Sequence, residues 1–476
     1  MNFKWTNIIP LVVAIAGIIS IGWWVTYDPV KDFVTTEPGL DNRGEGVAVN
    51  LNIRIGEYFE EFNTSASTLN ETWPRFRGEH SDNISRSEIR LVSRFGSEGP
   101  EIKWKVEMGE GHAGAAIYKG EVYVLDYDEA LKADMLRCFS LEDGTELWRR
   151  WYNVNIKRNH GMSRTVPAVT ENHILTLGPR SHVMCVERSN GNFLWGLNVE
   201  AEYGTEIPFW YTGQCPLIDN GLAIIATGGK ALLIAVDCTT GEVVWETPNP
   251  HGWAMSHSSV MPFEYEGVKM FVYSAVGGAC GIKADGPDAG KILWETNAWN
   301  HPVVAPSPVC LPDGKIFLAA GYGAGSMVLQ LSKETDGFEV EILQEYPPKD
   351  GLASEQQTPV VYEGHLLGIL PKDAGPLRNQ LVCVNPKDFT KIIWSSGQTV
   401  RFGLGPYMIA DGKLFVLSDD GTLTIVKPDL NQYIQIDQAK ILDGHDAWGP
   451  LAVADGYMVM RDSKTLLCID LAESRK

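Results

Sequence analysis

The sequence predicts an all-β chain folded as an eight-bladed β-propeller, and two observations lead to this prediction. Tryptophan recurs at intervals of 44 to 50 residues, at Trp104, Trp148, Trp195, Trp245 and Trp294, and again two intervals later at Trp394. Each interval holds several short apolar runs separated by glycine or proline, of which the chain has 48 and 26. Repeats of this length with several strands each are typical of propeller blades.

One short pattern is repeated before these tryptophans. The stretches "CFSLEDGTELW" (138–148), "CVERSNGNFLW" (185–195) and "AVDCTTGEVVW" (235–245) all place glycine four residues before tryptophan. An apolar run, a polar turn with glycine and a second apolar run predict a β-hairpin, with glycine supplying the positive φ that the turn requires. A second strand pair precedes each hairpin, as in 163–179 and 355–371. Each repeat therefore predicts a four-stranded blade.

The two ends of the repeat region predict how the ring closes. Residues 447–476 supply only three strands of an eighth blade, whereas residues 99–104 form a lone outer strand that carries Trp104. Pairing the lone strand with the last three would remove an exposed sheet edge. We therefore expect one domain over residues 73–476 that is closed by strand 99–104. The fifth and seventh blades lack the tryptophan, so their limits are harder to place.

The first 72 residues have a different composition. Residues 8–25 contain no charged residue and end near Trp23, Trp24 and Tyr27, which predicts a transmembrane helix within residues 1–27. A cleaved signal peptide is the alternative, since Ala14-Ile15-Ala16 resembles a cleavage site, although the cut would leave an apolar terminus. Residues 28–72 mix Pro, Gly, Asn, Glu and Thr and predict a stalk or linker with one strand or short helix packed on the main domain.

The net charge of the chain limits the kinds of macromolecule that it can bind. The formal net charge is −20, and no run of Lys and Arg alternates with aromatic residues. Such a chain repels phosphate backbones, so we expect no nucleic-acid partner.

The repeat resembles a known family. The form A-x-D-x-x-T-G-x-x-x-W, present as Ala235, Asp237, Thr240, Gly241 and Trp245, is similar to the repeat of the pyrroloquinoline-quinone (PQQ) family of eight-bladed propellers, the quinoprotein alcohol dehydrogenase-like fold. The stretch "WPRFRG" (73–78) resembles the opening of PQQ-like repeat proteins found in membrane and periplasmic settings of some bacteria. The resemblance implies that the six recurring tryptophans anchor neighbouring blades. With the N-terminal span, it also implies an inner (cytoplasmic) membrane, single-pass protein with its propeller in the periplasm.

For function, the resemblance leaves two classes open. The family includes quinoprotein dehydrogenases and non-catalytic members such as the propeller of the outer-membrane assembly machinery. Its enzymes typically have a disulfide between adjacent cysteines above the cofactor, and oxygen ligands that hold calcium. This chain has no adjacent cysteine pair and no C-x-x-C-H haem motif. We expect its third-strand cysteines to be buried free thiols: Cys138, Cys185, Cys383 and Cys468.

The candidate binding residues lie in or beside the connections that lead from one blade to the next. They are His112, His160, Arg164, Trp210, Gln214, Trp253, His257, His301, Glu355, Arg401 and Trp448. The same connections hold His251, Trp299, Gln356 and His445. By the resemblance, these segments surround one mouth of the central channel. The alternative is that the His and Trp side chains only fill space between blades.

No nucleophile and base pair at a defined spacing is visible, so no catalytic residue and no metal ligand is predicted. The sequence favours a membrane-anchored, non-catalytic propeller that serves as a periplasmic scaffold for a protein partner, without a cofactor. The alternative is a PQQ-dependent dehydrogenase with calcium at a divergent cofactor site.

Overall fold

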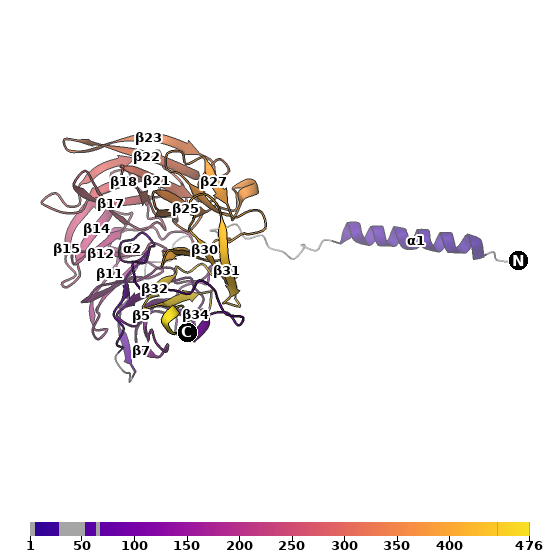
Figure 1. Cartoon of the computed structure of the whole chain (residues 1–476), viewed down its shortest axis with the longest axis horizontal. Helices are drawn as coiled ribbons and strands as arrows, with labels where there is room; N and C mark the ends of the chain where they lie inside the picture. Colours follow the sequence, from indigo (N-terminus) through magenta and orange to yellow (C-terminus); the bar gives the residue numbers. More distant parts are fainter. Residues whose placement is uncertain (1–4, 28–52, 63–66, 445, 476) are drawn as a thin grey trace. The chain divides into compact units, whose positions relative to one another are not determined.

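The computed structural model describes residues 5–27, 53–62, 67–444 and 446–475 (Figure 1). The chain divides into two compact units, Met1–Val47 and Ala48–Lys476. The 34 strands among the described residues all lie in the second unit, and they form eight antiparallel sheets, one for each predicted blade. The all-β, eight-bladed prediction is confirmed.

The strands follow the chain round the ring, and consecutive strands pair within each blade. The first four blades are β4(Ala116–Tyr118), β5(Glu121–Asp128), β6(Ala133–Ser140) and β7(Glu146–Asn153); β8(Ala168–Val169), β9(His173–Leu177), β10(His182–Glu187) and β11(Phe193–Asn198); β12(Leu217–Asp219), β13(Leu222–Ala226), β14(Ala231–Asp237) and β15(Val243–Pro248); β16(Met261–Tyr265), β17(Val268–Ala275), β18(Gly278–Lys283) and β19(Ile292–Thr296).

The remaining blades continue this order. They are β20(Val309–Cys310), β21(Lys315–Ala320), β22(Gly325–Glu334) and β23(Gly337–Tyr346); β24(Val360–Tyr362), β25(His365–Ile369), β26(Leu381–Val384) and β27(Ile392–Ser395); β28(Tyr407–Ala410), β29(Lys413–Leu417), β30(Thr422–Lys427) and β31(Ile434–Lys440); β32(Ala452–Ala454), β33(Tyr457–Arg461) and β34(Thr465–Asp470) with β3(Glu101–Glu107). The described residues also form α1(Trp5–Thr26), the short helix α2(Val199–Tyr203) and two 3-10 turns, Gly375–Leu377 and Glu473–Arg475.

The repeated turn has a clear physical cause. In the third blade, the Asp237 carboxylate accepts hydrogen bonds from the backbone amides of Thr239 and Thr240, both at 2.8 Å. Gly241 follows with a φ of 75°, which a side chain would disfavour. The chain then returns so that Ala235 pairs with Trp245 across the hairpin. The Asp-x-Thr-Thr-Gly sequence therefore fixes the turn that places the tryptophan.

The turn glycine of one blade receives the tryptophan of the preceding blade. A Cβ atom on Gly241 would lie 2.7 Å from Cγ of Trp195, and one on Gly144 would lie 2.6 Å from Cγ of Trp104. Trp195 Nε1 also donates to the carbonyl of Cys238 at 2.9 Å. Glycine and tryptophan thus recur together because each pair packs one blade against the next.

The ring closes where β3 pairs with β34. The register joins Ile102 to Ile469 and Trp104 to Cys468. Trp104 Nε1 donates to the carbonyl of Leu141 in the first blade at 2.8 Å, as Trp195 and Trp394 donate to carbonyls of the blades that follow theirs. In Figure 1 the indigo and yellow ends of the ring lie side by side. The last blade therefore takes its outer strand from the start of the repeat region.

Part of the segment assigned to the stalk packs on the propeller. β1(Tyr58–Glu61) pairs antiparallel with the outer strand β7, and β2(Thr72–Trp73) pairs with the inner strand β4. Residues 28–52 and 63–66 of the predicted stalk lie outside the described residues.

Residues 72–92 cross the central channel. Arg75 Nη1 donates to the carbonyl of Ile218 in the third blade at 3.1 Å. Two residues later, Arg77 donates to the carbonyls of Thr358 and Pro359 beside the sixth blade, at 2.9 and 3.1 Å. Farther along, Ile84 bridges to Ile409 in the seventh blade. Contacts to blades on opposite sides of the ring require the segment to pass through its centre.

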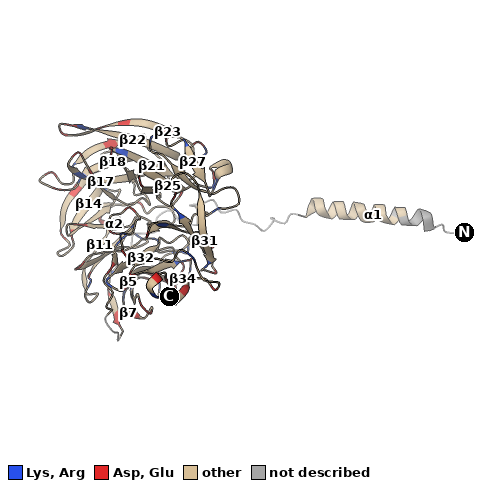
Figure 2. Ribbon diagram, viewed as in Figure 1, with Lys and Arg blue, Asp and Glu red and all other residues tan. Residues whose placement is uncertain are grey.

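The N-terminal unit contains α1, which covers the apolar segment from which a transmembrane span was predicted. In the part of the chain whose side chains the structure describes, no helix is both long and apolar enough to cross a membrane. The transmembrane prediction is therefore not supported. In Figure 2 the coloured part of α1 carries no charged side chain, whereas acidic and basic residues are interspersed over the blades.

Candidate functional site at the channel mouth

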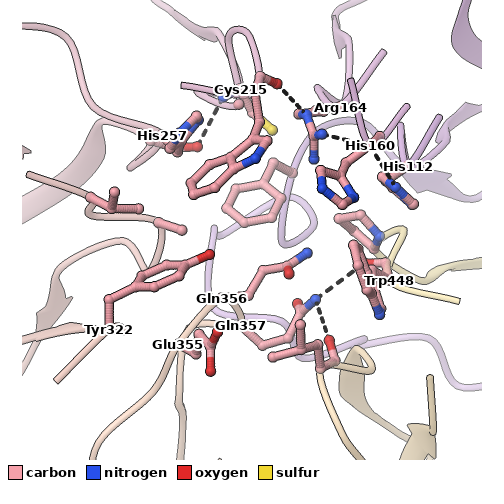
Figure 3. Close-up of a pocket in the computed structure, with 18 of the residues that line it drawn as sticks. His112, His160, Arg164, Cys215, His257, Tyr322, Glu355, Gln356, Gln357 and Trp448 are labelled. Carbon is pink, nitrogen blue, oxygen red and sulfur yellow. Dashed lines mark hydrogen bonds between the residues drawn. The ribbon is translucent and has the colours of Figure 1, made fainter. Parts of the chain in front are cut away.

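All eight connections that precede an inner strand contribute to one pocket of about 290 Å³ (Figure 3). Two hairpin turns and the channel-crossing segment complete its wall. The lining residues are Phe76, His112, His160, Arg164, Trp210, Gly213, Cys215, His257, Ser259, Val303, Ala305, Tyr322, Glu355, Gln356, Gln357, Lys372, Leu404, Trp448 and Pro450. The pocket forms because a closed ring directs every one of these connections toward the same axis.

Arg164 is the main positive group of the pocket. Its Nε donates to the carbonyl of Trp210 at 2.5 Å and its Nη2 to the carbonyl of His160 at 2.6 Å. These bonds hold two neighbouring connections together. Burial lowers the pKa of the guanidinium to about 10, so it stays charged at neutral pH. Among the described residues, no carboxylate forms an ion pair with Arg164, and its Nη1 makes no hydrogen bond.

Aromatic side chains form much of the wall. Trp210 stacks on Tyr322 with ring centroids 5.8 Å apart, and the Trp448 ring lies 4.7 Å from that of His112. In Figure 3, Tyr322 and Gln356 point into the space that Arg164 and Trp448 border. Tyr322 is 54% exposed, so this side of the pocket is open to solvent.

Backbone strain is concentrated in the same wall. His160, Trp210 and Tyr322 have φ values of 49°, 60° and 58°, in the left-handed region that bulky residues avoid. Apart from Tyr211, which is next to Trp210, they are the only aromatic residues with such φ values in the described part of the chain. Each such residue costs of order 1–3 kcal/mol, and strain of this kind is typical of functional sites.

Two histidines and the cysteine of the pocket are poorly suited to acid–base or nucleophilic chemistry at neutral pH. Burial, with the nearby Arg164 charge, lowers the pKa of His112 and of His257 to about 3, so both rings are neutral. Burial raises the pKa of the Cys215 thiol to about 11, so the thiolate that would act as a nucleophile is scarce. At neutral pH these three groups therefore offer hydrogen bonds rather than an activated nucleophile or base.

One carboxylate lines the pocket, that of Glu355. It forms an ion pair with Lys372, with Nζ and Oε1 2.9 Å apart, and the Lys372 ammonium lies 4.7 Å from the centre of the Tyr322 ring. Gln357 Nε2 donates to the carbonyls of Leu404 and Trp448 and so joins three connections. Within the described ranges, no group of three or more His, Cys, Asp or Glu side chains could hold a metal ion.

The structure brings together seven of the eleven predicted binding residues. His112, His160, Arg164, Trp210, His257, Glu355 and Trp448 all line the pocket, as does Gln356. Whether they bind a ligand stays a prediction.

The other four predicted residues lie elsewhere. Gln214 is fully buried and bonds the backbone of Ala226 through both ends of its amide. Trp253 is 4% exposed and donates to Asn297 Oδ1 at 3.0 Å. His301 packs edge-on against Trp299, and Arg401 donates to the backbone carbonyls of Pro376 in the sixth blade and Gln398 in the connection that follows it. Gln214 and Trp253 are buried by neighbouring strands and connections, and a binding role for any of the four stays a prediction. His445 lies outside the described residues.

Sequence reasoning missed several members of the wall. Tyr322 and Lys372 come from the hairpin turns between β21 and β22 and between β25 and β26, not from the connections between blades. Phe76 comes from the channel-crossing segment. The glycine-rich run "GYGAGS" around Tyr322 was the available signal, since such runs often contain residues with unusual backbone angles.

Comparisons with known proteins agree with this architecture. The crystal structure of BamB from Moraxella catarrhalis is 11% identical, with a TM-score of 0.52 over 78% of this chain and 98% of that chain. A europium-containing methanol dehydrogenase is 12% identical, with a TM-score of 0.57 over 82% of this chain and 89% of that chain. The computationally designed Ika8 protein is 11% identical, with a TM-score of 0.50 over 78% of this chain and 100% of that chain. At these identities the similarity shows the fold alone.

None of the curated proteins matches the sequence. A family model does match: the model described as outer membrane protein assembly factor BamB aligns with residues 87–258 and 132–344, which together span more than half of the 476 residues. The chain therefore belongs to this family of PQQ-repeat β-propellers.

Proposed function

We propose that this protein is a non-catalytic scaffold whose channel-mouth pocket binds a protein partner. The observation that carries the proposal is the convergence of all eight blade connections on one aromatic, hydrogen-bonding pocket that contains the unneutralised Arg164. Aromatic and arginine side chains are enriched where proteins bind one another. The family description, an assembly factor, is consistent with such a role.

The protonation states of the pocket favour binding over catalysis. A general base works best when its pKa is near the working pH. His112 and His257, with pKa values of about 3, are too weakly basic, and the Cys215 thiol is protonated at neutral pH.

The alternative is a PQQ-dependent dehydrogenase with calcium, and the pocket residues do not fit that cofactor. Calcium takes six to eight oxygen ligands, several of them from carboxylates. The pocket supplies a single carboxylate, Glu355, and Lys372 already neutralises it. No adjacent cysteine pair exists to cover a quinone. We therefore propose no cofactor.

Site-specific photo-crosslinking in the native cell tests the proposal. A benzoylphenylalanine at Tyr322, which is exposed and lines the pocket, should give a discrete covalent adduct with another protein. The matched control is the same residue at Val244, which is 55% exposed on the outer strand β15, far along the blade from the inner strands. An adduct at Tyr322 that disappears in a Trp210→Ala background supports the proposal.

Equal adducts at both positions, or none at Tyr322, would contradict it. The dehydrogenase alternative is tested on the same purified chain. Calcium-dependent PQQ absorption together with dye-linked alcohol oxidation would overturn the non-catalytic proposal.

The proposed location is the periplasmic side of the inner membrane. Its support is the charge-free segment 8–25 and the "WPRFRG" stretch, both features of the sequence. Membrane fractionation with alkaline extraction, and protease treatment of spheroplasts, test it. A chain that fractionates with cytoplasmic proteins, or one that begins at Gly17, would contradict the proposed anchoring.

A further inference from the structure

We infer that the channel-mouth pocket binds the C-terminal end of an extended peptide, with the terminal carboxylate on Arg164 and the last side chain against Trp210, Tyr322 and Trp448. The inference rests on the proposed protein-binding function and names what part of the partner is bound.

Charge is the first argument. The Arg164 guanidinium is held by backbone carbonyls, which satisfy Nε and Nη2 but do not neutralise the cation. The only carboxylate in the pocket is already paired with Lys372. A guanidinium in a partly buried site gains most from a carboxylate, through charge-assisted hydrogen bonds. Arg164 therefore selects an anionic group, and its Nη1, which bonds no described residue, is the donor that remains available for it.

The shape of the pocket is the second argument. The segment that crosses the channel reaches from Arg75 at the third blade to Arg77 at the sixth, and Phe76 between them lines the pocket. The channel is therefore blocked behind Phe76. A peptide that enters from the open side, past Tyr322 and Lys372, has to end there and cannot thread through.

The size of the pocket agrees with a chain end. A volume of about 290 Å³ lies at the small limit of the roughly 300–1,000 Å³ typical of ligand pockets. It suits one or two residues rather than a folded element. The aromatic rings of Trp210 and Trp448 would surround the last side chain, which favours an apolar residue at that position.

Two neutral histidines also line the pocket. His112 and His257 stay uncharged at neutral pH, so they add hydrogen-bonding capacity without competing for the carboxylate as cations. Arg164 is thus the cation of the lining that has no carboxylate partner among the described residues, whereas Lys372 is paired with Glu355. Gln356 and the Tyr322 hydroxyl are neutral neighbours. One anchoring cation fits one carboxylate better than it fits a polyanion.

Paired peptides test the inference on the full-length chain in detergent. The probe is a hexapeptide, Gly-Ser-Gly-Ser-Ala-Phe, labelled at its N-terminus, and fluorescence anisotropy reports binding. The free-acid form should bind saturably, and the C-terminal amide should bind at least about tenfold more weakly, because the amide removes the charge that Arg164 recognises. Equal binding of the two forms, or no saturable binding of either, overturns the inference.

Further probes separate the sources of a carboxylate. A peptide amide with an internal Glu tests a side-chain carboxylate, and N-acetylphenylalanine tests a small acid. If either binds as tightly as the free-acid hexapeptide, recognition of a peptide end is refuted. Weaker binding of both supports it.

Two variants assign the effect to the pocket. Arg164→Gln should weaken binding of the free acid by about tenfold and abolish the difference between acid and amide. Arg401→Gln is the matched control, since Arg401 also donates to backbone carbonyls but lies outside the pocket. Because Arg164 supports two connections, Glu355→Gln is a second variant that leaves those bonds intact. It removes the negative charge beside Lys372 and should strengthen binding of the acid severalfold.

The outcome separates this inference from the proposed function. If acid and amide bind alike while the Tyr322 adduct still depends on Trp210, the pocket binds a protein by another feature and only the C-terminal inference fails.

Discussion

Asp134 should make the stability of the propeller depend on pH in a direction opposite to that of an ordinary surface carboxylate. It lies in β6 with 2% of its surface exposed. Its Oδ2 accepts a hydrogen bond from the Tyr152 hydroxyl at 2.6 Å, and that hydroxyl lies 3.2 Å from His182 Nδ1 in the second blade. Asp134 Oδ1 has no hydrogen-bond partner among the described residues. Burial raises the pKa of Asp134 from 3.8 to about 7.

The upward shift of the Asp134 pKa fixes the sign of the pH dependence of stability. Between about pH 4 and pH 7 the folded state keeps the proton that the unfolded state has lost, so the free energy of unfolding falls as the pH rises. The stabilisation is complete below the unfolded pKa and is lost above about pH 7. The raised pKa corresponds to a total of ~4 kcal/mol, of which roughly 2–3 kcal/mol is lost between pH 5 and pH 8.

Asp134→Asn should remove this part of the pH dependence. Urea denaturation at pH 5 and pH 8 measures it: the stability of the variant should change by roughly 2–3 kcal/mol less than that of the wild type. Asp143→Asn on the same blade is the control, because backbone hydrogen bonding lowers rather than raises the pKa of Asp143. If wild type and Asp134→Asn lose the same stability between the two pH values, the argument for a buried, protonated Asp134 is wrong.

Two further predictions concern the packing of blade on blade. Trp104→Ala should lower the free energy of unfolding by about 3–5 kcal/mol in urea denaturation, because it leaves a cavity at the closure and removes the bond to the Leu141 carbonyl; an unchanged midpoint would contradict this. Gly241→Ala should lower the melting temperature more than Gly364→Ala does. Both glycines have φ near 75°, at 75° and 73°, but only at Gly241 would the new Cβ meet a side chain, that of Trp195. Equal losses would show that packing adds nothing to backbone strain.

The ring could be predicted from the sequence because its determinants are local and repeated. The turn around Asp237 and Gly241 depends on neighbouring residues only, and the same turn recurs at a fixed spacing. The partner of β3 could be predicted by counting strands, since the C-terminal end of the repeat region supplies only three strands of a four-stranded blade. The crossing of the channel by residues 72–92 had no such signal, because that segment has no repeat and its contacts are to blades more than a hundred residues away.

The pocket was predictable only in part, for a different reason. Sequence places a residue in a connection but does not say which way its side chain points. Trp210 and Trp253 occupy comparable connections, yet one lines the pocket and the other fills the space between two blades. Tyr322 escaped notice because it lies in a hairpin turn. What turns it and Trp210 toward the channel mouth is an unusual φ value, which a bulky residue adopts only when the surrounding fold enforces it.

The pocket and the ring closure depend on each other. β3 pairs with β34 across more than 350 residues of sequence, and pairings of such separation form late in folding. Phe76 at the base of the pocket precedes β3 by a short stretch, whereas Trp448 on its wall precedes the last three strands. Neither can take its place until the first and last blades meet. A chain whose ring stays open therefore lacks both the base and one wall of the pocket, so carboxylate binding would report closure of the whole propeller.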